Sequence, residues 1–597
     1  MRSFPLLSAL LLCGGANVVT AGNCVGKPPI VFDPTTEVRY KGIRRNGIEV
    51  FLNIPYGQDT GGANRFKPPR PYVPEPGCVV DATSYGPACP QRRRNGDPPR
   101  LLTNVSDISE DCLNLNVARP SDAAQHGHGC APLLPVLVYI YGGDFWSGQN
   151  RELTTAPDGM ILESVANGLP ILHVAMNYRV GVFGFARSDA LRSEGSENAG
   201  LRDQRLAIEW VRDHIAAFGG DPSRITIAGH SSGGLAVGLQ IMAYGGDQPV
   251  PFQQGICSSQ ALGPGIRGNY TIDAFRLVVG AAGCDASAVH LPSTLACLRA
   301  LPADALQAAA EATYAGDGVA HNIGDVWLPA VDGDFLPEAP SALLDAGRFA
   351  ADVTTMMGWC EDDVSIFTDA AIATAGDTHA FIRAYVPSVS PRLVDALLSL
   401  YPVCDFAADP AANLSAEFRR AARVFRDILA VCEPVRYAGA LAAAGNDVYL
   451  YDWNQTILDA LVAAAPAGHA GLRVMHSSEF AYIYGNTSHY NLSGYPFDPT
   501  PADYALVSRG SRSWSTFVST GKPGLAHHDT FQGFRTAIPA GAKGGANETW
   551  SLFVAGGPDE GFSVIDGPGS KAVVEAQKLR ERCAFINSPE FIEELRF

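Results

Sequence analysis

The stretch from Arg224 to Gly234, Arg-Ile-Thr-Ile-Ala-Gly-His-Ser-Ser-Gly-Gly, decides the fold of this chain. Its first half is a short apolar, β-branched run, typical of a buried parallel strand. The run ends in the pentapeptide Gly-His-Ser-Ser-Gly, and an apolar segment that can be helical follows. A strand, a tight turn and a helix around a G-x-S-x-G motif predict a strained turn that holds the hydroxyl of Ser231 above the carboxyl end of a sheet. Alone, the pentapeptide fits a glycine-bounded surface turn equally well, so other parts of a site have to be found elsewhere.

Composition narrows the class of protein. The chain has 597 residues, of which 46% are hydrophobic and 18% charged, so it can bury a large core. We expect residues 22–597 to form one large domain with insertions. The net charge of −17 argues against nucleic acid or an anionic membrane as a partner, because phosphates would be repelled. We expect a small-molecule or lipid substrate and neither a metal nor a cofactor, and the oligomeric state stays open.

The first residues predict secretion. Arg2 is followed by an apolar run from Phe4 to Cys13 and by small residues ending at Ala21, which together read as a signal peptide over residues 1–21. The apolar run is too short to span a bilayer. The segment from Phe585 to Phe597 is mixed and charged, so we expect neither a lipid anchor nor a transmembrane stem.

Cysteines and glycosylation motifs fit an extracellular protein. Removal of the signal peptide leaves twelve cysteines, an even number. Spacing favours three bridges, Cys89–Cys112, Cys284–Cys297 and Cys404–Cys432, and leaves Cys24, Cys78, Cys130, Cys257, Cys360 and Cys583 unassigned. Seven N-x-S/T motifs predict glycosylation at Asn104, Asn269, Asn413, Asn454, Asn486, Asn491 and Asn547.

Strands and helices alternate along the chain. A hairpin is expected between Val38 and Gly57, and helical stretches are expected over 273–349 and 378–444. Buried strands besides the one before Ser231 are predicted at Pro135–Ile140, Ile171–Met176, Val353–Met357 and Val448–Trp453, the last of these being the last core strand. This alternation predicts an α/β fold with a large, mostly parallel central sheet covered by helices.

Three polar sites follow predicted strands, and their order along the chain indicates a type of catalytic site. A serine hydroxyl is a poor nucleophile at neutral pH and needs a base, which in turn needs an orienting group. Ser231, the acidic cluster Glu361–Asp363 and His476 each come just after a core strand. The order serine, acid, histidine is the one expected of an α/β-hydrolase triad.

Longer motifs carry a family resemblance. Several segments resemble the type-B carboxylesterase/lipase, or cholinesterase-like, family: Ile54–Gly57, Arg65–Pro69, Glu110–Asn116, Asn177–Gly184, Asn198–Gln204 and Phe218–Pro222. The resemblance covers nearly the whole mature chain and implies the α/β-hydrolase fold of secreted fungal members. It implies Ser231 as nucleophile, His476 as general base and Asp363 as acid, with Asp362 and Glu361 as alternatives to Asp363.

The resemblance also implies an oxyanion hole made by the backbone N–H groups of Gly143, Asp144 and Ser232. Three positions depart from the family pattern: Asp144 replaces a glycine, His230 the usual glutamate before the nucleophile, and Ser232 the usual alanine. Aspartate tolerates unusual backbone angles, so the N–H of Asp144 can still point correctly. The backbone roles survive these changes, whereas acyl and leaving-group preferences can differ.

The substrate class follows from the loop between Cys89 and Cys112. Recognition of a choline ester needs an aromatic face for the quaternary ammonium group, and this loop contains no aromatic residue. The sequence therefore disfavours choline esters as substrates. The loop is short and only sparsely apolar, which favours a carboxylesterase for soluble esters over a triacylglycerol or sterol-ester lipase. A catalytically silent, cholinesterase-like binding protein is the third hypothesis, which the retained triad disfavours.

Overall fold

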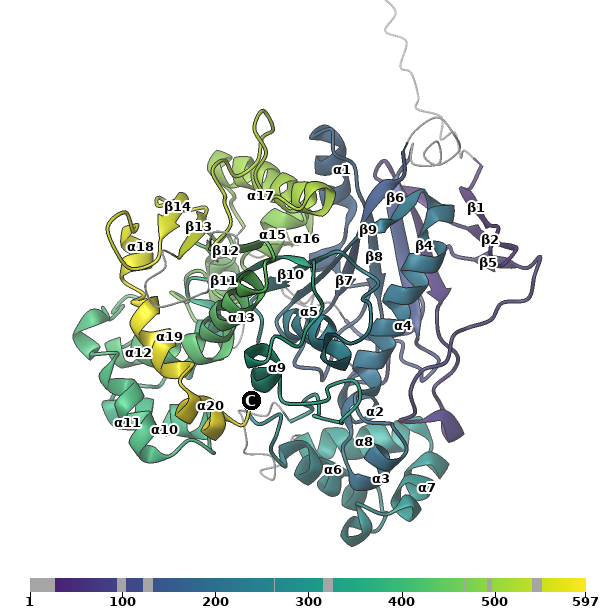
Figure 1. Cartoon of the computed structure of the whole chain (residues 1–597), viewed down its shortest axis with the longest axis horizontal. Coiled ribbons are helices and arrows are strands. Elements are labelled where there is room, and N and C mark those ends of the chain that lie inside the picture. Colours follow the sequence, from purple (N-terminus) through teal and green to yellow (C-terminus); the bar gives the residue numbers. More distant parts are fainter. Residues whose placement is uncertain are drawn as a thin grey trace, which may run out of the picture.

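The computed structural model describes residues 27–93, 104–121, 132–261, 263–314, 326–464, 468–490, 497–538 and 550–597. Within these ranges, an eleven-stranded sheet runs through the middle of the molecule (Figure 1). Along the sheet the strands are β14 (Gly561–Val564), β13 (Ser551–Ala555), β12 (Val448–Trp453), β11 (Thr354–Cys360), β10 (Gln254–Ser258), β9 (Gly220–His230), β7 (Leu134–Ile140), β8 (Leu172–Met176), β6 (Asn114–Pro120), β4 (Ile48–Pro55) and β3 (Ile43–Arg45). The strands from β13 to β8 are parallel, and those at the two edges are antiparallel. The predicted α/β class and the β3–β4 hairpin are confirmed.

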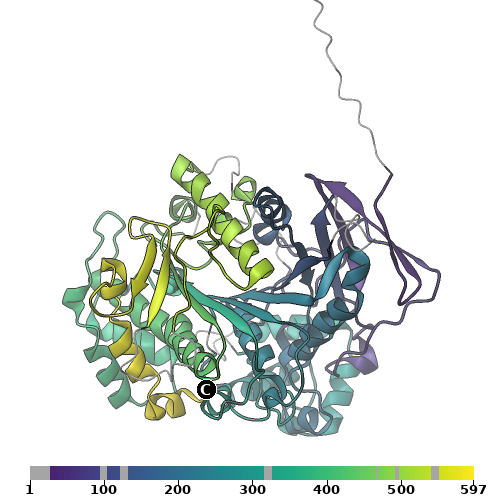
Figure 2. The ribbon, with the colours of Figure 1, turned by 45° about the horizontal axis from the view of Figure 1, so that its top comes forward.

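Helices cover both faces of this sheet. Figure 2 shows α17 (Pro501–Thr520) on one side of the strands and α13 (Cys432–Ala443) on the other. Helix α1 (Asp158–Ala166) packs beside α17, while α4 (Ala199–His214) and α5 (Ser232–Met242) pack against β9. Because both faces are covered, the sequences of the central strands are continuous apolar runs, and five of these strands (β7, β8, β9, β11 and β12) are predictable from sequence.

Two helical groups extend from the layers, at the two helical stretches predicted over 273–349 and 378–444 (Figure 1). The first holds α6 (Tyr270–Ala281), α7 (Pro292–Ala300) and α8 (Ala303–Tyr314), and the second α10 (Ala375–Tyr385), α11 (Pro391–Ser399) and α12 (Ala416–Arg426). A small separate sheet contains β1 (Ile30–Asp33), β2 (Val38–Lys41) and β5 (Val79–Asp81).

The expectation that Val448–Trp453 is the last core strand is wrong. β13 pairs with β12 in parallel, and β14 closes that edge in antiparallel fashion. β13 is a buried run of five residues that begins 98 residues after β12 ends, so its spacing along the chain differs from that of the other strands.

Two of the three expected disulfides are present, and the third is wrong. Cys89 bonds Cys112 and Cys284 bonds Cys297. Cys432, buried at the start of α13, instead bonds Cys583 of α19 (Leu579–Ile586), 151 residues along the chain. Cys404 lies exposed in a short 3-10 turn, so proximity in sequence misleads here. Among the described residues Cys78, Cys257, Cys360 and Cys404 are unpaired, and Cys24 and Cys130 lie outside them.

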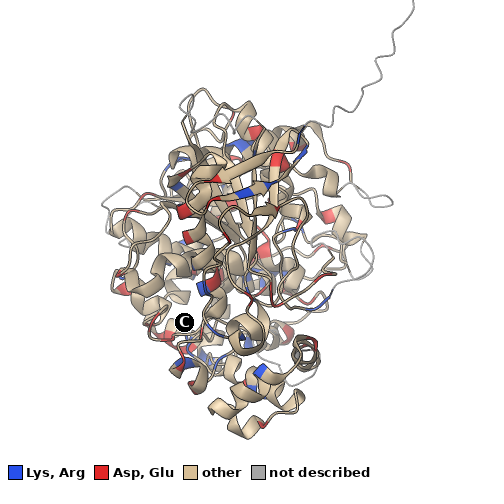
Figure 3. Cartoon of the chain, turned by 90° about the vertical axis from the view of Figure 1, so that its right-hand side faces the viewer, with Lys and Arg blue, Asp and Glu red and all other residues tan. Residues whose placement is uncertain are grey.

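Charges of both signs are interspersed along the ribbon (Figure 3). Arg512 of α17 contacts Glu163 of α1 at 2.7 Å and Asp529 at 2.8 Å. Such partly exposed pairs contribute at most about 1 kcal/mol each. No helix in the described part of the chain is long and apolar enough to cross a membrane.

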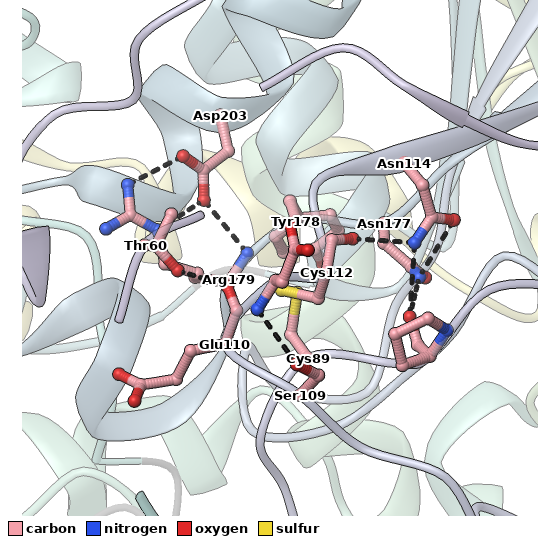
Figure 4. Close-up of a disulfide and its surroundings, with 12 residues drawn as sticks. Thr60, Cys89, Ser109, Glu110, Cys112, Asn114, Asn177, Tyr178, Arg179 and Asp203 are labelled. Carbon is pink, nitrogen blue, oxygen red and sulfur yellow. Dashed lines mark hydrogen bonds and ion pairs between the residues drawn. A yellow bond between two sulfur atoms is a disulfide. The ribbon is translucent and has the colours of Figure 1, made fainter. Parts of the chain in front are cut away.

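A buried ion pair fixes the segment that follows β8. Arg179 donates to the Asp203 carboxylate through its backbone N–H, Nε and Nη2, at 2.7 to 3.0 Å, close to the Cys89–Cys112 bridge (Figure 4). The preceding residue, Tyr178, stacks on Tyr141 with ring centroids 4.3 Å apart, and each phenol donates to the other residue's backbone oxygen at 2.7 Å. The buried pair therefore anchors Tyr141, the residue just before the glycine turn at 142–143.

Candidate active site

Ser231 occupies the predicted sharp turn between β9 and α5. Its backbone adopts φ 61° and ψ −129°, a strained conformation for a residue with a side chain. Its N–H donates to the Ser258 oxygen at 2.9 Å, which ties the turn to β10. A Cβ on Gly229 or Gly233 would lie only 2.1 Å or 2.3 Å from a backbone oxygen, so the turn requires glycine on both sides. The packed neighbours hold Ser231 in this strained geometry.

His476 and Asp363 meet at the same end of the sheet. Asp363 opens a 3-10 turn after β11, and His476 precedes α15 (Phe480–Ile483). The His476 Nδ1 is hydrogen-bonded to Asp363 Oδ1, and the His476 backbone N–H donates to the Asp363 backbone oxygen at 2.7 Å. The second carboxylate oxygen accepts from Ser259 Oγ at 2.7 Å and from the Cys360 N–H at 2.9 Å.

These contacts set the charges of the pair. Burial alone would raise the pKa of Asp363, but the His476 contact and the Ser259 and Cys360 donors bring that pKa below its usual value. Burial also lowers the pKa of His476, and the Asp363 carboxylate outweighs it, so the net pKa of the imidazole is raised. Asp363 is therefore an anion that holds the imidazole in one orientation and favours its protonated form.

The two alternative acids point elsewhere. Glu361 contacts Arg423 at 2.7 Å and Arg426 at 3.4 Å. The Asp362 N–H donates to the Val474 oxygen, and burial followed by the Glu361 charge raises the pKa of its carboxyl. Of the three acidic residues, Asp363 is the one that the structure brings to His476.

Ser231 and His476 line one cavity of about 220 Å³. Gly143, Asp144 and Phe367 line the same cavity. The Phe367 ring lies 5.3 Å from the imidazole of His476, and this side chain is 46% exposed. A substrate entering here would meet the serine, the histidine and an apolar rim together.

The expected oxyanion turn lies against the serine. A Cβ on Gly142 would lie 2.9 Å from the Ser231 Cβ, which places this turn beside Ser231. Asp144 adopts φ 57° and is exposed, although its charge is still among the causes that raise the pKa of His476. Ser232 begins α5, where the first N–H groups have no acceptor within the helix. Its hydroxyl also accepts from the Phe145 N–H at 3.2 Å and so joins the helix to the turn.

Sequence reasoning missed three residues around the histidine. Ser259 follows β10, a strand that was not predicted, and Cys360 was left unassigned. Glu479 stands only three residues after His476, yet nothing in its neighbours shows that its side chain turns inward. In the described part of the chain, no group of three or more His, Cys, Asp or Glu side chains is placed to hold a metal ion.

The glycosylation motifs differ in accessibility. Asn104, Asn269 and Asn413 are exposed. Asn486 Nδ2 donates to the Leu153 oxygen, and the Nδ2 of Asn454, the atom that a glycan would occupy, is buried. The structure therefore argues against the Asn454 prediction, and Asn491 and Asn547 lie outside the described residues.

The fold is that of an α/β hydrolase. Residues 35–539 match the model of the carboxylesterase family, and the chain belongs to this family of carboxylic ester hydrolases. A secreted lipase of Arthroderma benhamiae is 54% identical over 95% of this chain and 96% of its own length. An inactive carboxylesterase-like protein of Byssochlamys spectabilis is 34% identical over 94% of this chain and 95% of its own. The crystal structure of Aspergillus niger EstA superposes with a TM-score of 0.75 at 25% identity, covering 96% and 99% of the two chains.

Proposed function

We propose that this protein is a secreted serine carboxylesterase that hydrolyses carboxylic esters through Ser231, His476 and Asp363. The observation that carries the proposal is that Ser231, strained at the elbow, and His476, hydrogen-bonded to a buried anionic Asp363, line one cavity. Secretion is supported by the secreted relative and by the signal-peptide pattern over residues 1–21, which lie outside the described part.

The reaction is a two-step acyl transfer. His476 takes the proton of Ser231 while the serine oxygen attacks the ester carbonyl. The backbone N–H groups of Gly143, Asp144 and Ser232 hold the oxyanion, and each such donor typically contributes about 3 kcal/mol. The imidazolium, stabilised by Asp363, then gives its proton to the departing alcohol, and water repeats the cycle on the acyl-enzyme.

Replacement of the serine tests this proposal. Ser231→Ala should lower kcat on a short p-nitrophenyl ester by more than about 10⁴-fold. Ser232→Ala is the matched control, because it removes the neighbouring hydroxyl and keeps the backbone N–H, and it should lose at most about tenfold. An organophosphonate probe should label the wild type at Ser231, as read by peptide mass spectrometry. Label at another residue, or a Ser231→Ala enzyme that still turns over, would refute the assignment.

A lipase acting on triacylglycerols or sterol esters is the second candidate. The 54% identical relative is named a secreted lipase, and apolar side chains are exposed at the cavity: Phe367 is 46% exposed, and Leu153, between the lining residues Glu152 and Thr154, is 48% exposed. Turnover of one ester, measured below and above its solubility limit, separates the two. A jump at the limit indicates a lipase, and simple saturation indicates a carboxylesterase.

A catalytically silent binding protein is the third candidate function, because the Byssochlamys spectabilis relative is named an inactive carboxylesterase-like protein. The hydrogen bond between His476 and Asp363, and the cavity that Ser231 and His476 share, disfavour it. Absence of both turnover and organophosphonate labelling in correctly folded protein would favour it.

A further inference from the structure

A second histidine–carboxyl pair lies directly behind His476. His230, the last residue of β9, has its ring 4.2 Å from that of His476, and its Nε2 lies 3.6 Å from Glu479 Oε1. Both side chains are buried, with 6% and 1% of their surface exposed. Neither facing atom, His230 Nε2 or Glu479 Oε1, has a hydrogen-bond partner among the described residues. Two buried polar atoms that face each other in this way are satisfied when a proton lies between them.

We infer that His230 and Glu479 hold one proton between them. Glu479 is then a positioning residue for the esterase reaction, because its charge sets the pH at which His476 becomes a free base. The inference rests on the proposed function, because it needs His476 to act as the base. Glu479 acts through His476 and has no contact with the reacting atoms.

The surroundings determine where the proton sits. Burial and then the neighbouring His476 keep the pKa of His230 well below its usual value, so this imidazole is neutral and Nε2 can accept. Burial, followed by the Asp363 charge, raises the pKa of Glu479 to about 7. Below that pH Glu479 is a neutral acid facing the His230 nitrogen, and above it Glu479 is an anion whose charge helps to raise the pKa of His476.

Other titratable groups face the pair from every neighbouring element. The thiol of Cys360 in β11 donates to Glu479 Oε2 at 3.0 Å. Burial, together with the Glu479 charge, raises the pKa of four phenols, which therefore stay neutral: Tyr139, Tyr451, Tyr484 and Tyr490. Glu152 faces two of these phenols, and Asp144 faces His476 from the cavity side. Of the two carboxyls beside His476, the pKa of Asp363 is lowered and that of Glu479 is raised to about 7.

The test is the acid limb of the pH profile of kcat/KM on a soluble p-nitrophenyl ester. Glu479→Gln keeps the shape and removes the charge, so the midpoint of the limb should move to lower pH by roughly 0.5 to 1 unit. The ratio of mutant to wild-type activity should be highest near pH 7. There the wild type carries the Glu479 charge, and this charge keeps part of its His476 imidazole protonated and unable to act as a base. A merely structural role would instead lower activity by the same factor at every pH.

A charge swap supplies the second variant. His230→Glu combined with Glu479→Gln returns one carboxyl to the pair, and the midpoint should move back towards that of the wild type or above it. Titration of active Ser231 with an organophosphonate normalises each variant for folded enzyme. Parallel profiles in both variants, or a midpoint that rises in Glu479→Gln, overturn the inference. If the inference is overturned but the wild type is active and is labelled by the organophosphonate, the proposed function still stands. A wild type that is not labelled would contradict both the proposed function and this inference.

Discussion

Two buried histidine–carboxyl pairs lie side by side at the end of the sheet, and the pKa values of their carboxyls are shifted in opposite directions. Asp363 accepts from His476 Nδ1, Ser259 Oγ and the Cys360 N–H, and its pKa is lowered. Glu479 accepts from a weak thiol donor, and its pKa is raised to about 7. Burial is similar, so the number and strength of donors decide which carboxyl stays charged.

The largest expected effect separates the two carboxyls by catalytic role. Asp363→Asn removes the anion that orients and charges His476, so kcat should fall about 10⁴-fold. Glu479→Gln touches His476 only through its charge and should stay within about tenfold at pH 8. Steady-state kinetics on a p-nitrophenyl ester measure both. The control is Asp362→Asn, at the half-buried neighbouring carboxyl, and a loss there equal to that of Asp363→Asn would reverse the assignment.

The pH dependence of stability should differ in sign between the carboxyls. Glu479 has a folded pKa of about 7, above its usual value near 4.3 when unfolded, so it favours folding while protonated. That advantage is lost as the pH rises from the unfolded value through the folded pKa, by up to about 4 kcal/mol in all. Glu479→Gln should therefore flatten the fall in apparent Tm between pH 5 and pH 8, by roughly 2 to 4 °C.

Asp363 supplies the opposite case. Its lowered pKa gives stability that is present above the unfolded value near 3.9 and is lost as the pH falls through the lower folded pKa. Calorimetry at matched scan rates compares wild type with each single variant. A Glu479→Gln enzyme whose apparent Tm follows that of the wild type from pH 5 to pH 8 would show that this carboxyl is ionised across the range.

A smaller effect is expected from one donor to Asp363. Ser259→Ala removes the 2.7 Å hydroxyl contact, so the pKa of Asp363 should rise and kcat/KM should fall about tenfold, corresponding to about 1.4 kcal/mol. Ser258→Ala is the matched control, because that hydroxyl accepts from Tyr451 at 2.8 Å. Equal losses in the two variants would show that packing, and not the bond to Asp363, accounts for the change.

Sequence patterns predicted the parts of the site that local structure determines. Ser231 follows from strand, glycine and helix signals within eleven residues, and the family motifs place His476 and the acidic cluster. Selection of Asp363 over Glu361 depends on Arg423 and Arg426 of another helix, which no local pattern reveals. The Cys432–Cys583 bridge and the inward turn of Glu479 likewise depend on packing between distant segments.

The smallest effect concerns Cys360, which contacts both carboxyls. Its backbone N–H donates to Asp363 and its thiol to Glu479, so a side-chain change alters the second pair and keeps the first bond. Cys360→Ser offers a stronger donor and should lower the pKa of Glu479, whereas Cys360→Ala removes the donor and should raise it. The acid-limb midpoint of kcat/KM should then move up in the serine variant and down in the alanine variant, by roughly 0.2 pH unit each. Shifts of the same sign would mean that the thiol acts on His476 through packing, since only a change in the Glu479 charge predicts opposite directions.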